Sequence, residues 1–272
     1  MALCGVGEST GNFLGHALAG SFLIILGLWW NSTDILRYVC KKEKQTYHHF
    51  KAWIHRAELL GGIIVIVLVS VGITGLQLYA GHSETQLSRL LRLQHIVMYV
   101  FYGLLGVVRI LNSIIHSFSV SLTTLALSNA FFLQSFVLYN HDRVGAIVEV
   151  YLHKILGLIT ISSGLVSFSE VITNNNLTLG LLRSSLTLLQ GTWFWQIGCV
   201  LYYPREHLEW DLMDHHNNTL LSIYFCWHCL LTHIIIGVNY AAISWLVKWR
   251  LRKICFTKVP LLKQTEQDSD EM

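Results

Sequence analysis

The chain contains little charge and almost no proline. Only 13% of its 272 residues are charged and only 2 are proline, whereas 53% are hydrophobic. This amount of apolar material exceeds what the core of one soluble domain would bury. The scarcity of charge therefore excludes a separate soluble domain and favours a membrane protein.

Lysine and arginine are absent from the first fifteen positions. A cleavable signal peptide carries positive charge ahead of its apolar core, whereas here the positive charge follows the apolar run that begins at His16. We therefore expect this run to remain as a membrane helix, with the N-terminus on the lumenal or extracellular side.

Two further absences argue against two known seven-helix classes. The apolar run 219–247 contains no lysine, which a rhodopsin-like photoreceptor needs for its Schiff base. Neither proline lies within an apolar run, and Arg109 stands between Val108 and Ile110 rather than after an acid. Both features disfavour a rhodopsin-type G-protein-coupled receptor.

Seven apolar runs account for most of the chain. Each is close to, or longer than, the roughly 20 residues that cross a bilayer as a helix. The runs are 16–36, 57–79, 93–112, 118–139, 150–172, 181–203 and 219–247. We predict an all-α, polytopic membrane protein in contact with the lipid bilayer. Residues 1–253 form a single seven-helix transmembrane bundle, and residues 254–272 form a disordered, acidic cytoplasmic tail.

The basic residues form two blocks that set the orientation of the bundle. Six of the 19 Lys and Arg lie between residues 37 and 56, and six more lie beyond residue 247. Seven crossings place both blocks on one side of the membrane, and the positive-inside rule assigns that side to the cytoplasm. The prediction is a lumenal or extracellular N-terminus and a cytoplasmic C-terminus.

The six cysteines do not have the pattern of a disulfide framework, because four lie in or beside apolar runs. Cys40 and Cys255 flank membrane helices on the basic side, where the alternatives are reversible palmitoylation and an unmodified thiol. Cys226 and Cys229 have CxxC spacing but lie inside the last apolar run, so we expect them to pack rather than to react.

Histidines and carboxylates are frequent toward the predicted lumenal side. Imidazole and carboxylate are the ligands that suit zinc and other divalent first-row metals. The candidate ligands are His16, His95, His141, His153, Asp211, Asp214, His215 and His228. They predict a metal or proton-handling site in the lumenal leaflet. The alternative is that each histidine is an interfacial residue with its polar tip in water.

Polar side chains also occur deeper in the membrane. Two acidic and two basic side chains lie at similar depth near the predicted cytoplasmic face: Glu58, Glu170, Arg109 and Arg183. We predict that they form ion pairs between helices, with a transport path as the alternative. Four amides lie in mid-helix: Asn129, Gln134, Gln190 and Gln196. These amides either line a cavity or form hydrogen bonds between helices.

Short motifs spread over the whole chain resemble those of one family. They are Gly11 to Phe13, Gly15 to Leu18, Gly27 to Trp30, Gly103 to Val107, Leu127 to Ala130, Tyr139 to His141, Leu181 to Leu186, Gln190-Gly191, Trp210 to His215 and Cys226 to His228. Together they resemble the transmembrane protein 45 family. The resemblance implies a multi-pass protein of Golgi, endosomal or lysosomal membranes whose biochemical activity is poorly defined.

Two functions are therefore expected. The first is a non-enzymatic membrane protein that acts in trafficking or signalling through protein partners. The alternative is a metal-dependent membrane enzyme, on the model of ceramidases or adiponectin receptors, or a small-molecule or lipid-binding protein with a lumenal-leaflet site. Glycine-rich helix faces, such as Gly191 with Gly198, are compatible with a homodimer. No nucleic-acid binding is expected.

Overall fold

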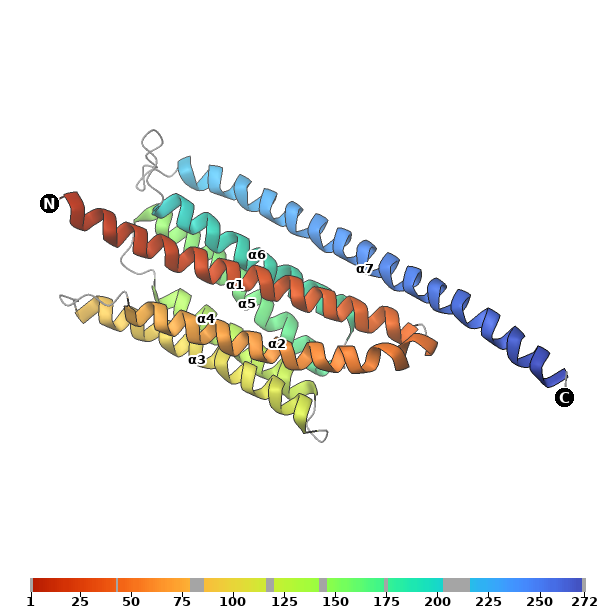
Figure 1. Cartoon of the computed structure of the whole chain (residues 1–272). Helices are drawn as coiled ribbons and strands as arrows, with labels where there is room; N and C mark the ends of the chain where they lie inside the picture. The colour runs from red at the N-terminus through yellow and green to blue at the C-terminus, as the bar shows by residue number, and fades with distance from the viewer. Residues whose placement is uncertain are drawn as a thin grey trace.

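Seven α-helices make up the described part of the chain, and no strand occurs in it. The computed structural model describes residues 2–42, 44–78, 86–115, 120–141, 146–173, 176–202 and 216–270. The helices are α1 (Ala2–Lys42), α2 (Lys44–Leu78), α3 (Gln86–Ile114), α4 (Val120–His141), α5 (Ile147–Ile172), α6 (Leu177–Leu201) and α7 (His216–Asp270). Consecutive helices run in opposite directions along one elongated bundle (Figure 1).

The all-α fold predicted from the seven apolar runs is confirmed. The largest differences in helix length occur in α1 and α7. α1 begins at Ala2 rather than near residue 16, because an apolar run marks the part of a helix that suits the bilayer and not the point where the helix begins. α7 continues to Asp270, through a stretch expected to be disordered. Residues 261–267 consist mainly of Leu, Lys, Gln and Glu, which favour the helical conformation. Pro260, which was not expected to lie in a helix, is inside α7 and opposes this preference.

Six of the described helices are long and apolar enough to cross a membrane. α6 is the exception. It has 25 residues, or about 37 Å at 1.5 Å per residue, so it is long enough to span. Its hydropathy is lower because its buried face carries polar side chains such as Arg183, Ser184 and Gln190. α6 packs against α1, α5 and α7, so these groups lie inside the bundle rather than in lipid.

α1 is the helix on which two groups of helices pack. On one side, Leu26 and Trp30 join a core cluster with side chains of α2, α3 and α4, including Phe131. On the other side, Leu23 joins a cluster built mainly from α5 and α6, including Trp193. The contact between α4 and α5 connects the two groups.

Glycine allows two helix pairs to approach closely. A methyl group on Gly191 of α6 would lie 2.7 Å from the backbone oxygen of Gly20 in α1. Between α2 and α3, a methyl group on Gly62 would lie 3.1 Å from the backbone oxygen of Gly106. Around Gly75, by contrast, such a methyl group would meet nothing within 4 Å. Glycine is therefore required for packing at some of these positions and not at others.

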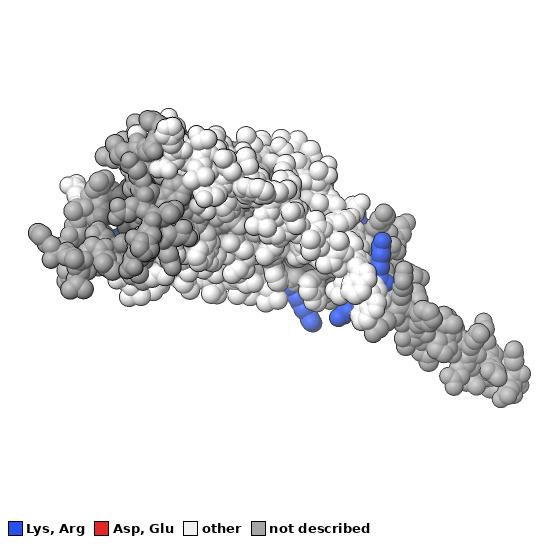
Figure 2. Space-filling model, turned by 90° about the horizontal axis from the view of Figure 1, so that it is seen from above, with Lys and Arg blue, Asp and Glu red and all other residues white. Residues whose placement is uncertain are grey.

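The described surface is largely apolar, as expected for side chains in contact with lipid. Phe136 and Leu158 are each 67% exposed. Lys and Arg appear in Figure 2 mainly toward one end of the bundle. At this end Val247 of α7 packs in one cluster with Val39 and Cys40 of α1, which brings the basic segments that follow them together. The two basic blocks therefore lie at the same end of the bundle.

A charged cluster within the helix bundle

Six ionisable side chains gather near the basic end of the bundle, and we refer to them as the charged cluster. They are Asp34, Arg37, Glu58, Arg109, Glu170 and Arg183. They come from α1, α2, α3, α5 and α6. Three arginines face three carboxylates, so the formal charges of the cluster balance.

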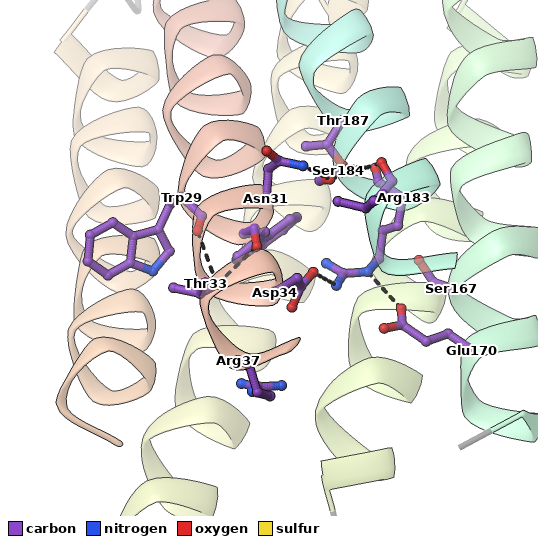
Figure 3. A network of polar contacts seen from close by, with 12 residues as sticks. Trp29, Asn31, Thr33, Asp34, Arg37, Ser167, Glu170, Arg183, Ser184 and Thr187 are labelled. Atoms are coloured by element: carbon purple, nitrogen blue, oxygen red, sulfur yellow. Dashed lines mark hydrogen bonds and ion pairs between the residues drawn. The ribbon is translucent and has the colours of Figure 1, made fainter. Parts of the chain in front are cut away.

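Arg183 is the centre of the cluster (Figure 3). Its Nε donates to Glu170 Oε2 at 2.7 Å, and its Nη2 donates to Asp34 Oδ2 at 2.8 Å. Arg183 and Glu170 are both buried. These bonds join α6 to α5 and to α1. Removing one partner would leave an uncompensated buried charge at a cost of about 3–5 kcal/mol, so the three charged groups depend on one another.

The other two arginines have different surroundings. Arg37 forms an ion pair with Glu58, and both side chains are partly exposed. Arg109 has no carboxylate oxygen within 4.0 Å in the described part of the chain. Instead, its guanidinium carbon lies 5.7 Å from the centre of the Trp30 ring, and that of Arg183 lies 5.5 Å from the same ring. Trp30 thus provides cation–π contacts to both arginines.

The cluster surrounds a cavity of about 50 Å³. Its other lining residues are Trp30, Thr33, Asn112, Thr123, Thr124 and Leu127. Two of them contribute buried polar atoms that have no hydrogen-bond partner within the described part of the chain, namely Trp30 Nε1 and Thr123 Oγ1. Since buried polar groups are nearly always paired, these two atoms indicate that the cavity is polar and incompletely satisfied by the protein.

The sequence predicted part of this cluster. Its prediction of interhelical ion pairs is confirmed for Glu170 with Arg183. Glu58 pairs with Arg37 rather than with Arg109. Asp34 was missed, although it is the sole carboxylate in the predicted run 16–36, and an acid at membrane depth is a signal of a functional position.

The predicted lumenal histidines are only partly brought together. The rings of His16 in α1 and His153 in α5 lie 6.0 Å apart, centre to centre. His153 Nδ1 donates to the backbone oxygen of Glu149 at 2.9 Å, because a carbonyl oxygen can only accept. Tyr202 lies beside His16, with 5.2 Å between the ring centres.

The remaining candidate ligands do not join this pair within the described residues. His95 belongs to α3, whose neighbours are α2 and α4. His228 contacts Trp193 and lies 3.4 Å from Gln196 Oε1. The side chain of His141 and all of Asp211, Asp214 and His215 lie outside what the structure describes. No group of three possible metal ligands occurs among the described side chains. The metal site therefore stays a prediction.

Amide side chains connect several helices. Gln190 of α6 donates to Ser163 Oγ at 2.7 Å, and Gln134 of α4 accepts a hydrogen bond from the Tyr102 hydroxyl. α7 is attached through Asn239, which donates to Asn31 Oδ1 at 2.6 Å and to Ser32 Oγ at 3.0 Å. Interhelical hydrogen bonding, one of the two predicted roles for mid-helix amides, is confirmed for Gln134 and Gln190.

The fold and the charged cluster define the class: an integral, multi-pass, all-helical membrane protein with a polar cavity among its helices. Residues 120–241 match the model of a family of unknown function (DUF716). The chain is 22% identical to mouse transmembrane epididymal protein 1A and 23% identical to rat transmembrane epididymal protein 1, over 86% of this chain and 82% of each relative. Human transmembrane epididymal protein 1 is 24% identical over 56% of both chains.

These relatives carry the word transmembrane in their names, which agrees with the apolar helices of this chain. The matches support similarity to the family of unknown function. The transmembrane protein 45 name, which came from the sequence motifs, stays a prediction.

Proposed function

We propose that this chain is a non-enzymatic multi-pass membrane protein, a member of the family that its residues 120–241 resemble, and that it binds a small ligand in the cavity of the charged cluster. The observation that carries the proposal is the excess of unpaired donors around this cavity. Arg109 has no carboxylate partner among the described residues, and Trp30 Nε1 and Thr123 Oγ1 have no hydrogen-bond partner.

The donors define the chemistry of the ligand. Guanidinium, indole N–H and hydroxyl groups are complemented by oxygen acceptors, and guanidinium pairs best with carboxylate or phosphate. A cavity of about 50 Å³ holds roughly three to four water molecules. It therefore suits a compact carboxylate or phosphate group, either as a free anion or as the head of a larger molecule.

Direct ion pairs account for Arg183 and Arg37. Arg109 has no carboxylate oxygen within 4.0 Å among the described residues, although the charges of Asp34 and Glu58 lie near enough to attract it. Each carboxylate of the charged cluster lies on another arginine. A guanidinium that has no direct carboxylate contact in a membrane bundle costs free energy, and ionisable residues at membrane depth mark functional positions. Arg109 is therefore the residue that we expect to contact the ligand.

The proposal is tested by thermal unfolding of the purified protein with acetate or inorganic phosphate. A second arm compares nanodiscs of neutral lipid with nanodiscs containing phosphatidic acid, which separates a free anion from a lipid head. A ligand that binds only the folded state stabilises it by RT ln(1 + L/Kd), where L is the ligand concentration, so the melting temperature keeps rising with the logarithm of the ligand concentration above Kd. We expect such a rise in the wild type and its loss in Arg109→Gln.

Two further variants control the experiment. Arg56→Gln removes the same charge from an exposed position at the same end of the bundle, and it should respond as the wild type does. Thr123→Val removes one hydroxyl at nearly constant volume and should weaken binding about 5- to 10-fold, the worth of one hydrogen bond. If no anion or anionic lipid stabilises the wild type, or if Arg109→Gln responds equally, the cavity is filled by water and the proposal is wrong.

A zinc or other divalent metal site at the opposite end is the second candidate, favoured by the contact between His16 and His153. In it the two imidazoles would provide ligands, and the predicted ligands before α7 would complete the set. Such a metal would supply a Lewis acid or tie the helices together. A role in trafficking or signalling, and a Golgi, endosomal or lysosomal location, rest on the sequence resemblance and stay predictions.

A further inference from the structure

One of the four mid-helix amides differs from the others. Gln134, Gln190 and Gln196 all lie beside polar groups of other helices. Asn129 is exposed on the surface of α4 and has no hydrogen-bond partner among the described residues. It lies at least about 14 Å from either end of α4, near mid-membrane depth. An amide in hydrocarbon at this depth costs free energy until it finds a partner.

Asn129 lies within an apolar stripe on α4. The stripe consists of Leu122, Leu125, Asn129, Leu133 and Phe136. These residues are spaced by three or four, the repeat that places side chains on one helix face and forms the seam of paired helices. Leu122 is 44% exposed and Phe136 is 67% exposed.

The opposite face of α4 is buried against the rest of the bundle and includes Leu127 and Phe131. Beside the stripe, between α3 and α4, is a groove of about 260 Å³. It is lined by Phe101, Leu104, Val108, Leu122, Leu125, Ala126 and Asn129. The groove gives the apolar side chains of a second helix a place to insert.

We propose that the α4 stripe packs against the α4 stripe of a second copy of this chain, with the two Asn129 amides hydrogen-bonded to each other across a twofold axis. Two copies inserted in the same orientation present parallel α4 helices. A twofold axis places identical residues opposite one another, and an amide complements itself because it both donates and accepts. A single asparagine in an apolar seam is a known determinant of register and of the paired state.

Lipid alone would cover the apolar side chains of the α4 stripe but would leave its amide unpaired. An acyl chain has no donor or acceptor for the amide, and phospholipid head groups lie outside the hydrocarbon core. The glycines that suggested self-association in the sequence, Gly191 and Gly198, face α1 of the same copy. A second copy seated on the α4 stripe is the occupant that satisfies both the apolar surface and the amide.

The experiment measures energy transfer between two differently labelled full-length copies in membranes, together with the mass of the purified protein in mild detergent. We expect a dimer in the wild type. Asn129→Leu should lower the association constant about three- to tenfold, which is the effect of losing interhelical hydrogen bonding in a membrane. Its melting temperature as a monomer should stay unchanged or rise, because no contact within the copy is lost. Asn129→Gln, which keeps the amide, should dimerise.

A matched pair of alanine substitutions tests whether dimerisation depends on the α4 stripe or on any part of the lipid-facing surface. Phe136→Ala on the stripe and Leu158→Ala on α5 remove side chains that are equally exposed. The first should weaken dimerisation and the second should not. A monomeric wild type in membranes, or a dimer that Asn129→Leu and Phe136→Ala leave intact, would overturn the proposal. A lipid retained on a monomeric wild type in native mass spectrometry would overturn it as well.

Discussion

The substitution Gly191→Ala tests the close packing of α1 against α6. The added methyl group would lie 2.7 Å from the backbone oxygen of Gly20 and 2.7 Å from the backbone nitrogen of Ile24. Both atoms belong to a helix and cannot move individually, so α1 and α6 must separate by on the order of 1 Å to restore normal contact. Overpacking of this kind costs about 1–3 kcal/mol. The gain of about 1 kcal/mol in helix propensity offsets it only in part.

The measurement is thermal unfolding of the purified protein in detergent, and the control is Gly157→Ala. A methyl group on Gly157 of α5 would meet nothing within 4 Å, so this variant receives the propensity gain without the clash. We expect Gly191→Ala to lower the melting temperature by several degrees and Gly157→Ala to leave it unchanged or raise it. Equal melting of the two variants would refute the inferred α1–α6 contact.

Three further outcomes follow from the structure. Asn239→Leu should release α7 and speed its hydrogen exchange, because the buried Asn31 oxygen loses its donor at a cost of about 1–3 kcal/mol; His233→Ala, on an exposed part of α7, is the control. Tags at the two chain ends should be protected and accessible, respectively, when only the plasma membrane is permeabilised, and finding both on one side would contradict an odd number of crossings. If a metal is bound, His153→Ala and excess chelator should lower the melting temperature to a similar value, whereas a wild type insensitive to chelator would argue against the metal.

The fold could be predicted from the sequence because the membrane imposes it. A helix is nearly the only way to satisfy the backbone of an apolar segment in lipid, so seven apolar runs imply seven helices. Hydropathy alone does not identify α6 as a membrane span, because polar side chains such as Arg183, Ser184 and Gln190 count against it, although they are buried and hydrogen-bonded. The helix ends were harder to predict, as the N-terminal start of α1 and the length of α7 illustrate.

The candidate site was harder to predict, because depth in the membrane can be counted along a sequence but neighbouring helices cannot be identified. Glu170 and Arg183 lie at the same depth and on adjacent helices, so their predicted pairing is confirmed. His95 and His153 also share a predicted depth, yet α3 does not pack beside α5. The cavity lies beside Arg109 because the three carboxylates of the charged cluster form ion pairs with Arg183 and Arg37 instead. No feature of the sequence predicts which arginine pairs with which carboxylate.

The polarity of α6 has a consequence for how the protein is made. A helix that carries an unpaired arginine is inserted into the bilayer at a cost of about 2.5–3.5 kcal/mol for that residue. The partners of Arg183 are Asp34 in α1 and Glu170 in α5, and both precede it in the chain. When α6 leaves the ribosome its counter-charges are therefore already synthesised, and we expect α6 to enter the membrane together with its packing against the earlier helices. A variant lacking both carboxylates should fail at biogenesis, with α6 retained outside the bilayer, before any question of ligand binding arises.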